Sequence, residues 1–419
     1  MDSLKLISCG ILIGLLIAII WNKWLSFCGF SYPYNTFLFM YQDRFMDFFN
    51  TLEFLKTYTY LGQDLAVYYP SVYWLFYPFA QMEKNFSFIL FNAIFFINLY
   101  LFALYYVSDT NAHSQKFTYQ VFIIPIVFLS FPVLYCFDRG NFEMMIFVLL
   151  SWSIIFFSQQ RYYLSAIFLA CAASTKIFPI LFLLLFIKQK QFKPAIFTCV
   201  LFSLLCILPL FTLHGGFIAN LSTVMTNTHH LAQSSFMLEG VRQTVSLMAL
   251  FKISYLVQHP HATYNQFAQY VLFISPWYAM MTAVLTGLVS LYILACEETL
   301  WKQTMLITAM MLLFPPVSYD YKLIYLFIPL FLYLNHAEKE KDPCNLFYII
   351  FFTLLLIPKN YHIFHLSLKY YLGRLDSLDI SVSIFIDIFI LTIFSMMLIF
   401  SRVPVFFSSE VLDHTKAKI

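Results

Sequence analysis

The sequence predicts an all-α polytopic membrane protein, from its composition, its long apolar runs and its scarcity of charge. Hydrophobic residues make up 61% of the 419 residues and charged residues only 11%, with a mean hydropathy of +0.77. A helix that crosses the hydrocarbon core needs about 20 mostly apolar residues. We therefore expect residues 1–419 to form one integral membrane domain, with no soluble domain.

About twelve stretches are predicted to be transmembrane helices. They are residues 7–21, 86–107, 119–137, 142–158, 162–175, 177–187, 195–213, 266–295, 303–317, 323–335, 345–358 and 380–401. The first lacks an A-x-A-like cleavage site, so we interpret it as an uncleaved anchor. An even number of crossings places both chain ends on one side. Two longer loops, residues 22–85 and 214–265, are then outer loops, and the second is expected to include an interfacial helix.

Four charged groups each follow an odd-numbered stretch, so alternating crossings bring them to one membrane face. They are Asp43-Arg44 with Asp47, Asp138-Arg139, Lys176, and Asp320 with Lys322. Charges at such positions are costly to place and are often functional. The short basic turn at residues 188–193 is the clearest inner anchor under the positive-inside rule. We therefore expect the charged groups to face outside, where they suit a substrate that carries an anion and a lipid tail.

Charge and metal-ligand patterns exclude several other classes of function. The formal net charge of +3 is too mild to indicate nucleic acid as a partner. The eight cysteines form no CxxC pair and lie mostly in apolar runs, where they are typical packing residues. His229 and His230 are adjacent, so both rings cannot easily bind one metal ion. We expect no metal or cofactor, and we interpret His230 as facing solvent or an acceptor.

Two acids in the first outer loop are the candidates for a general base. Asp43 and Asp47 lie four residues apart, so their carboxylates would share a face if the segment is helical. A carboxylate in a partly desolvated pocket can have a raised pKa and accept a proton. The alternative is an amphipathic surface helix whose acids are simply solvated.

Cations at two span ends are candidate contacts for a phosphate group. Arg139 offers paired donors on a planar guanidinium, although a hairpin turn in which Asp138 and Arg139 pair with each other is the simpler alternative. Lys176 lies shortly before Pro179, which would aim the N–H groups of the next helix toward the same region. A lone lysine at a span end more often only snorkels to the interface.

Further candidates lie at the neighbouring span ends. Tyr69 precedes Pro70 at the approach to the second stretch, although tyrosines there also form interfacial belts. Tyr319, Asp320 and Lys322 follow a Pro-Pro break and add an acid and a base. A further acid inside the last stretch is isolated and has no predicted function.

The order of these motifs resembles glycosyltransferase family 87, the mannosyltransferase-like family of the GT-C superfamily, whose donors are polyprenyl-phosphate sugars. The resemblance spans roughly residues 40–330 and rests on Asp47-Phe48, Tyr69-Pro70, Arg139-Gly140-Asn141, Lys176-Ile-Phe-Pro179 and Ser318-Tyr319-Asp320. No single motif is specific, so the shared order and sidedness carry the resemblance. In one departure, Tyr321-Lys322 follows the late aspartate where the family often has histidine, which makes Lys322 a substitute phosphate contact.

The resemblance implies a GT-C-like fold and an inverting transfer of a single sugar, mannose favoured, from a polyprenyl-phosphate donor to a lipid or glycan acceptor. Asp47 would deprotonate the acceptor hydroxyl, with Asp43 as its rival. The donor phosphate would be held by Arg139, Lys176 and Lys322. The remaining substrate contacts would come from Tyr69, Asn141, Tyr319, Asp320 and His230.

Two other functional classes stay open at this point. A flippase or transporter of lipid-linked oligosaccharides would place its charges near the bilayer midplane and show related halves, whereas these charges lie at span ends. An O-antigen ligase or polymerase would bind phosphate by the same logic but transfer an oligosaccharide. We favour a multi-pass protein of the bacterial inner membrane whose site faces the periplasm.

Overall fold

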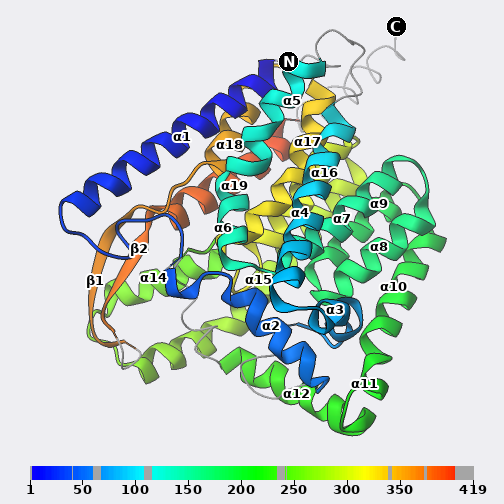
Figure 1. The fold of residues 1–419 in the computed structure, drawn as a ribbon, viewed down its shortest axis with the longest axis horizontal. Coiled ribbons are helices and arrows are strands. Elements are labelled where there is room, and N and C mark those ends of the chain that lie inside the picture. The colour runs from blue at the N-terminus through cyan, green and yellow to red at the C-terminus, as the bar shows by residue number, and fades with distance from the viewer. Residues whose placement is uncertain are drawn as a thin grey trace, which may run out of the picture.

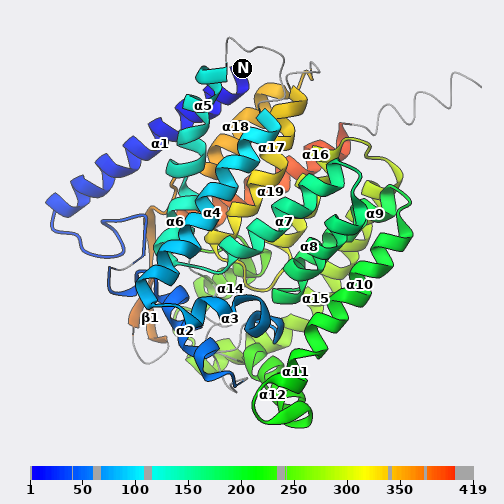
Figure 2. The same ribbon diagram turned by 45° about the vertical axis from the view of Figure 1, so that its right-hand side comes forward.

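Helices dominate the computed structural model, in which two views show a tilted bundle with the N-terminus at one end (Figures 1 and 2). The structure describes residues 2–39, 41–59, 68–107, 116–233, 241, 243–337, 342–371 and 375–401. Within these ranges, the side chains of residues 116–118, 227–233, 363–371 and 375–379 are left undescribed.

Every predicted apolar stretch coincides with helical structure. In chain order these helices are α1 (Asp2–Phe27), α4 (Lys84–Val107), α5 (Lys116–Ile124) with η3 (Pro125–Leu129) and α6 (Phe131–Arg139), α7 (Glu143–Ser158), α8 (Tyr162–Thr175), η4 (Phe178–Phe182) with α9 (Leu183–Lys188), α10 (Phe192–Ile207) with α11 (Pro209–Thr212), α15 (Tyr264–Ala295), α16 (Leu300–Leu313), η5 (Asp320–Leu326) with α17 (Phe327–Ala337), α18 (Asn345–Leu356) and α19 (Val382–Phe400).

The count of about twelve crossings is not confirmed. Within the described residues, five helices are long and apolar enough to cross a membrane, or six if the bent pair Tyr119–Leu129 and Phe131–Arg139 counts as one span. Several of the other apolar helices have only 10–17 residues. One such break separates α8 from α9: α8 ends before Lys176, and a separate 3₁₀ turn begins at Phe178 with Pro179 in its first turn, where proline cannot continue the preceding helix.

Among the described residues, the loops carry five further helical segments and one hairpin. The helical segments are η1 (Tyr41–Asp43), α2 (Met46–Thr57), α3 (Ser71–Gln81), α12 (Gly216–Gln233) and α14 (Leu247–Gln258). Strands β1 (His362–Tyr371) and β2 (Leu375–Ser381) pair antiparallel, with His362 opposite Ser381. The structure remains consistent with the all-α prediction, and the hairpin is a small addition that the prediction did not include. Alternating apolar and polar residues in this segment favour strands.

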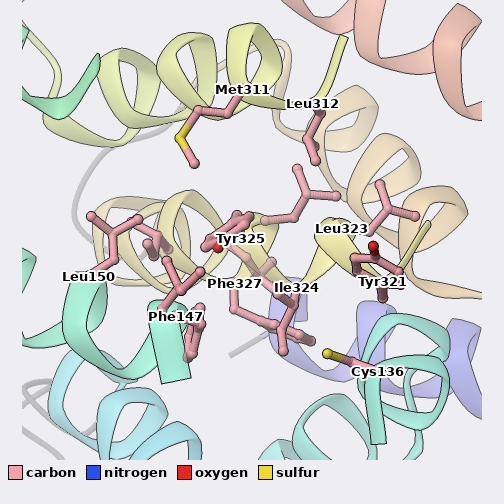
Figure 3. Close-up of a cluster of buried hydrophobic side chains, with 14 of the residues drawn as sticks. Cys136, Phe147, Leu150, Met311, Leu312, Tyr321, Leu323, Ile324, Tyr325 and Phe327 are labelled. Atoms are coloured by element: carbon pink, nitrogen blue, oxygen red, sulfur yellow. The ribbon is translucent and has the colours of Figure 1, made fainter. Parts of the chain in front are cut away.

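The buried core surrounds η5 and α17. Phe147 and Leu150 of α7 approach Tyr325 from one side, and Met311 and Leu312 of α16 approach from another (Figure 3). At the edge of the bundle α1 packs on α18, where a Cβ atom at Gly10 or Gly14 would collide with Thr353 or Ile357. Such spaced glycines let two membrane helices approach closely.

The loop helices gather at one end of the bundle. Figures 1 and 2 both place α2, α3, α11 and α12 at the end opposite the N-terminus. Helix α6 ends and α7 begins near that end, so the Asp138–Glu143 turn lies beside α2. This arrangement positions the residues of the candidate site.

Candidate functional site

Asp47, Arg139 and Asn141 form the centre of the site. Both oxygens of Asp47 bind the guanidinium of Arg139: Nη2 donates to Oδ1, and Nε lies 3.2 Å from Oδ2. The amide Nδ2 of Asn141 also donates to Oδ2 of Asp47, at 2.7 Å. About a fifth of each charged side chain stays exposed, 21% for Asp47 and 19% for Arg139. Bidentate pairs of this kind fix geometry as well as charge.

The glycine between Arg139 and Asn141 makes this contact possible. Gly140 ends α6 in the left-handed conformation, with φ of +62°. A Cβ atom there would lie 2.9 Å from Cβ of Phe48 and 3.3 Å from Cα of Phe45. A side chain would therefore push α2 away from the turn and separate Asp47 from its two partners.

A second pair ties the segment before α2 to the same turn. Arg44 Nε lies 3.1 Å from Asp138 Oδ1, and the backbone N–H of Phe45 donates to the carbonyl oxygen of Asp138 at 2.8 Å. Asp138 therefore pairs with Arg44, and Arg139 pairs with Asp47. The predicted alternative, a turn in which Asp138 and Arg139 pair with each other, is not the arrangement adopted.

Asp43 and Asp47 do not share a helix face. Asp43 ends the 3₁₀ turn η1, whereas Asp47 lies in the first turn of α2, and Phe45 between them adopts a positive φ of 60°. Asp43 is exposed and makes no ion pair with any residue that the structure describes. The two carboxylates were expected to share a face if the segment were helical. The segment is not one continuous helix, because the backbone leaves the helical conformation at Phe45 between the two acids.

Glu143 extends the network toward Lys176. Its backbone N–H donates to Oδ1 of Asn141 at 2.9 Å, and its Oε1 lies 2.5 Å from Nζ of Lys176. The hydroxyl of Tyr325 donates to its other oxygen. Glu143 is 1% exposed. Lys176 therefore has a buried partner and is not a lysine that only snorkels.

Lys322 adds a second cation beside Glu143. Its Nζ lies 4.9 Å from the ring centre of Phe178 and 3.5 Å from the carbonyl oxygen of Val317. Lys322 lies outside the candidate spans, and burial lowers its pKa to about 8. A cavity of about 10 Å³, roughly the room one water needs, is lined by Glu143, Lys176, Phe178, Pro179, Met311, Lys322 and Tyr325.

The segment before α3 docks on the end of α8. The N–H of Tyr69 approaches the carbonyl oxygen of Thr175 at 3.4 Å, and the hydroxyl of Ser71 donates to the carbonyl oxygen of Ser174. Tyr68 places its ring 4.9 Å from Nζ of Lys176. Burial, with smaller effects from the nearby carboxylates, raises the pKa of Tyr68. The Tyr-Pro motif thus holds the aromatic segment against Lys176.

Asp320 lies in a second buried cluster. Its backbone N–H donates to the carbonyl oxygen of Gln243 at 3.0 Å, and Ser383 donates to its Oδ2 at 3.3 Å. Asp387, the isolated acid of the last stretch, lies 2.9 Å from Nζ of Lys359. Burial and the nearby charge of Asp387 raise the pKa of Asp320. The cluster therefore holds two buried carboxylates and one lysine.

An aromatic layer separates the two clusters. The guanidinium of Arg139 lies 4.1 Å from the ring centre of Phe39, which stacks on Tyr135 at 5.0 Å. The hydroxyl of Tyr135 then donates to the side chain of Gln243. Tyr319 lies next to Asp320, with its ring 5.7 Å from that of Tyr321.

The other predicted residues are less informative. His230 belongs to α12, but its side chain lies outside the described residues. No group of three His, Cys, Asp or Glu side chains within the described ranges is placed to hold a metal ion. The predicted site residues thus divide between the Asp47–Lys176 network with Lys322, the Asp320 cluster, the exposed Asp43 and the undescribed His230 side chain.

Comparison with known protein families identifies the family of the chain. The sequence pattern of glycosyltransferase family 87 matches residues 66–316, more than half of the chain. The chain belongs to glycosyltransferase family 87. No curated protein shows significant sequence similarity to it. The resemblance predicted from motif order is therefore confirmed, and the chain is a membrane glycosyltransferase that takes a sugar donor and an acceptor.

The family 87 match covers only part of the candidate site. Tyr69, Arg139, Asn141, Lys176 and Glu143 lie inside the matched residues. Two groups lie outside them, namely the first-loop acids Asp43 and Asp47 and the late motif Tyr319, Asp320 and Lys322. The match therefore establishes the class of reaction without assigning the base.

Sequence reasoning missed Glu143 and Lys359. Glu143 was detectable, because it is the only charged residue between Arg139 and Arg161 and begins an apolar helix. Lys359 had no comparable signal, since its relevance depends on Asp387, which lies on helix α19, whereas Lys359 follows the end of α18. Pairing between separate segments is a property of packing and cannot be read from either segment alone.

Proposed function

We propose that the chain transfers a single hexose, with mannose favoured, from a polyprenyl-phosphate donor to a lipid or glycan acceptor. The observation that carries the proposal is the continuous network Arg139–Asp47–Asn141–Glu143–Lys176. It holds an accessible carboxylate beside cations, as displacement of a phosphate from an anomeric carbon requires. A single displacement would invert the anomeric centre.

Asp47 is the general base in this proposal. It takes the proton of an acceptor hydroxyl while that oxygen bonds to the anomeric carbon and the carbon–oxygen bond to phosphate breaks. Arg139 contacts both oxygens of Asp47, so the pair has to open first. Movement of Arg139 onto the donor phosphate would open it, because the guanidinium exchanges one oxyanion for another. Asp43, exposed and close in sequence, stays the rival.

Lys176 and Lys322 complete the donor-phosphate site with Arg139. Glu143 balances one of the two lysines that line the small cavity, which leaves one lysine uncompensated. An incoming phosphate would compensate it, and the cations would stabilise the charge that develops on the leaving polyprenyl phosphate. Asn141 and Tyr69 are proposed to contact the sugar.

Residues of the second cluster have a less direct place in the proposal. Tyr319 and Asp320 would contact substrate less directly, because Asp320 lies in the buried cluster with Asp387 and Lys359. His230 is proposed to contact the acceptor. We place the site at the outer face of a bacterial inner membrane, because the basic turns lie at the opposite ends of α8 and α10.

The test is an assay of purified protein with a panel of polyprenyl-phosphate sugars. Asp47→Asn should reduce turnover by about 10²–10⁴-fold while donor binding survives, because the amide cannot take a proton. Asp43→Asn is the matched control and should stay active. A dead Asp43→Asn with an active Asp47→Asn would move the base to Asp43, and two active variants would refute general-base catalysis by either acid. Transfer only of an oligosaccharide from a diphosphate carrier would indicate a ligase.

A further inference from the structure

A large basic cavity lies at the other end of the helices that carry the candidate site. Its volume is about 770 Å³, and it is formed by two hairpin turns, one between α7 and α8 and one between α9 and α10. Figures 1 and 2 show these turns near the end of the bundle that holds the N-terminus. Since each helical residue adds about 1.5 Å, α7 separates the cavity from Glu143 by roughly 24 Å.

The lining of the cavity is cationic and contains no acid. Arg161 comes from the first turn, and Lys190 and Lys193 come from the second. All three are exposed, and none lies within 4 Å of a carboxylate among the described residues. Lys188, next to the second turn, instead pairs with Glu298 at 2.7 Å. The three cations are therefore available to an anion from outside the chain.

An apolar surface leads away from the cavity along α8 and α10. Tyr163 and Phe192 line the cavity and are 54% and 57% exposed, and Ile196, one turn further along α10, is 63% exposed. Within the candidate span Phe192–Thr212, only 17% of its apolar 18-residue window is buried inside the protein. In a membrane protein such a surface faces acyl chains, so the cavity lies where a lipid headgroup would meet α10.

We propose that this cavity binds the headgroup of an anionic phospholipid from the leaflet opposite the catalytic site. Arg161 suits a phosphodiester through its planar pair of donors, and Lys190 and Lys193 add charge. The volume falls within the range of ligand-sized sites. The apolar side chains of α8 and α10 contact the acyl chains, which a soluble phosphate lacks. The proposal is independent of the sugar donor and of the base.

The test compares lipid binding by native mass spectrometry of purified protein offered equal amounts of phosphatidylglycerol and phosphatidylcholine. The variant Arg161→Gln/Lys190→Gln/Lys193→Gln should lose the preference for phosphatidylglycerol. Each cation near an anionic lipid contributes about fivefold to binding, so the triple variant should bind on the order of 100-fold more weakly. Its elution from a sizing column should match that of the native chain, because all three side chains are exposed.

A matched control removes the same charge elsewhere. Lys23, Lys56 and Lys84 are exposed and do not line the cavity, so Lys23→Gln/Lys56→Gln/Lys84→Gln should keep the preference. The proposal is overturned if the cavity variant still prefers phosphatidylglycerol, or if the control loses the preference equally. Displacement of phosphatidylglycerol by glycerol phosphate at equal concentration would also overturn it, because the site would then take a soluble phosphate.

Discussion

Replacing Glu143 by glutamine tests whether the charges of Lys176 and Lys322 bind the donor phosphate. Glu143 is almost fully buried. It forms an ion pair with the ammonium of Lys176 and accepts a hydrogen bond from the hydroxyl of Tyr325. Glutamine keeps the shape but removes the charge. Lys176 and Lys322 would then line one small cavity without an acid. We expect the variant to be less stable when empty and to bind an anion more strongly.

The expected loss of folding stability follows from the burial of the Glu143–Lys176 ion pair. Removing one partner of a buried ion pair costs about 3–5 kcal/mol. Because 12% of the Lys176 side chain stays exposed and a tyrosine ring lies beside it, the lower end, about 3 kcal/mol, is expected. A polyprenyl phosphate at about 100 times its dissociation constant stabilises the native chain by about 2.7 kcal/mol. It should stabilise Glu143→Gln by more, since it restores the missing charge.

Thermal unfolding in detergent, with and without a polyprenyl phosphate, measures both effects. Tyr325→Phe is the control, because it removes one hydrogen bond to Glu143 and leaves every charge in place. That variant should lose about 1.5–3 kcal/mol and respond to the ligand like the native chain. Equal stabilisation of Glu143→Gln and the native chain by the ligand would refute binding of the phosphate by Lys176 and Lys322. An empty variant as stable as the native chain would refute the structural importance of the pair.

Three further predictions concern pH, the second cluster and sidedness. Because burial lowers the pKa of Lys322 to about 8, its charge is present below that pH and lost above it. Donor binding should therefore weaken as pH rises through about 8, and an unchanged pH profile in Lys322→Met would contradict the assignment. Lys359→Met should destabilise the chain by about 3–5 kcal/mol, since it leaves buried carboxylates without their cation. Adding Asp387→Asn should recover most of that loss, and no recovery in the double variant would argue against the ion pair. Cysteines placed at Asn50 and Gln191 should react with impermeant reagents from opposite sides of the membrane, and labelling of both from one side would remove the basis for the proposed orientation.

The helical character of the chain follows from its sequence. Apolar runs need helical structure in a membrane because every backbone polar group must be satisfied within the segment, and each predicted run is helical here. The chain breaks were also detectable, since Gly140 and Pro179 each prevent a regular continuation. Motif order was sufficient to identify family 87. The number of crossings was not determined, because short and bent helices leave the span count open.

Tertiary structure decided which charges pair. Asp47 and Arg139 lie 92 residues apart, and Lys176 meets an acid 33 residues earlier in the chain. Asp138 pairs with Arg44 rather than with its neighbour, and Asp387 gains a lysine that no local pattern connects to it. Hydropathy and helical period are properties of one segment, so they place a charge at a helix end. The partner of that charge depends on the rotation and depth at which separate helices pack, and this is fixed only when the whole core is assembled.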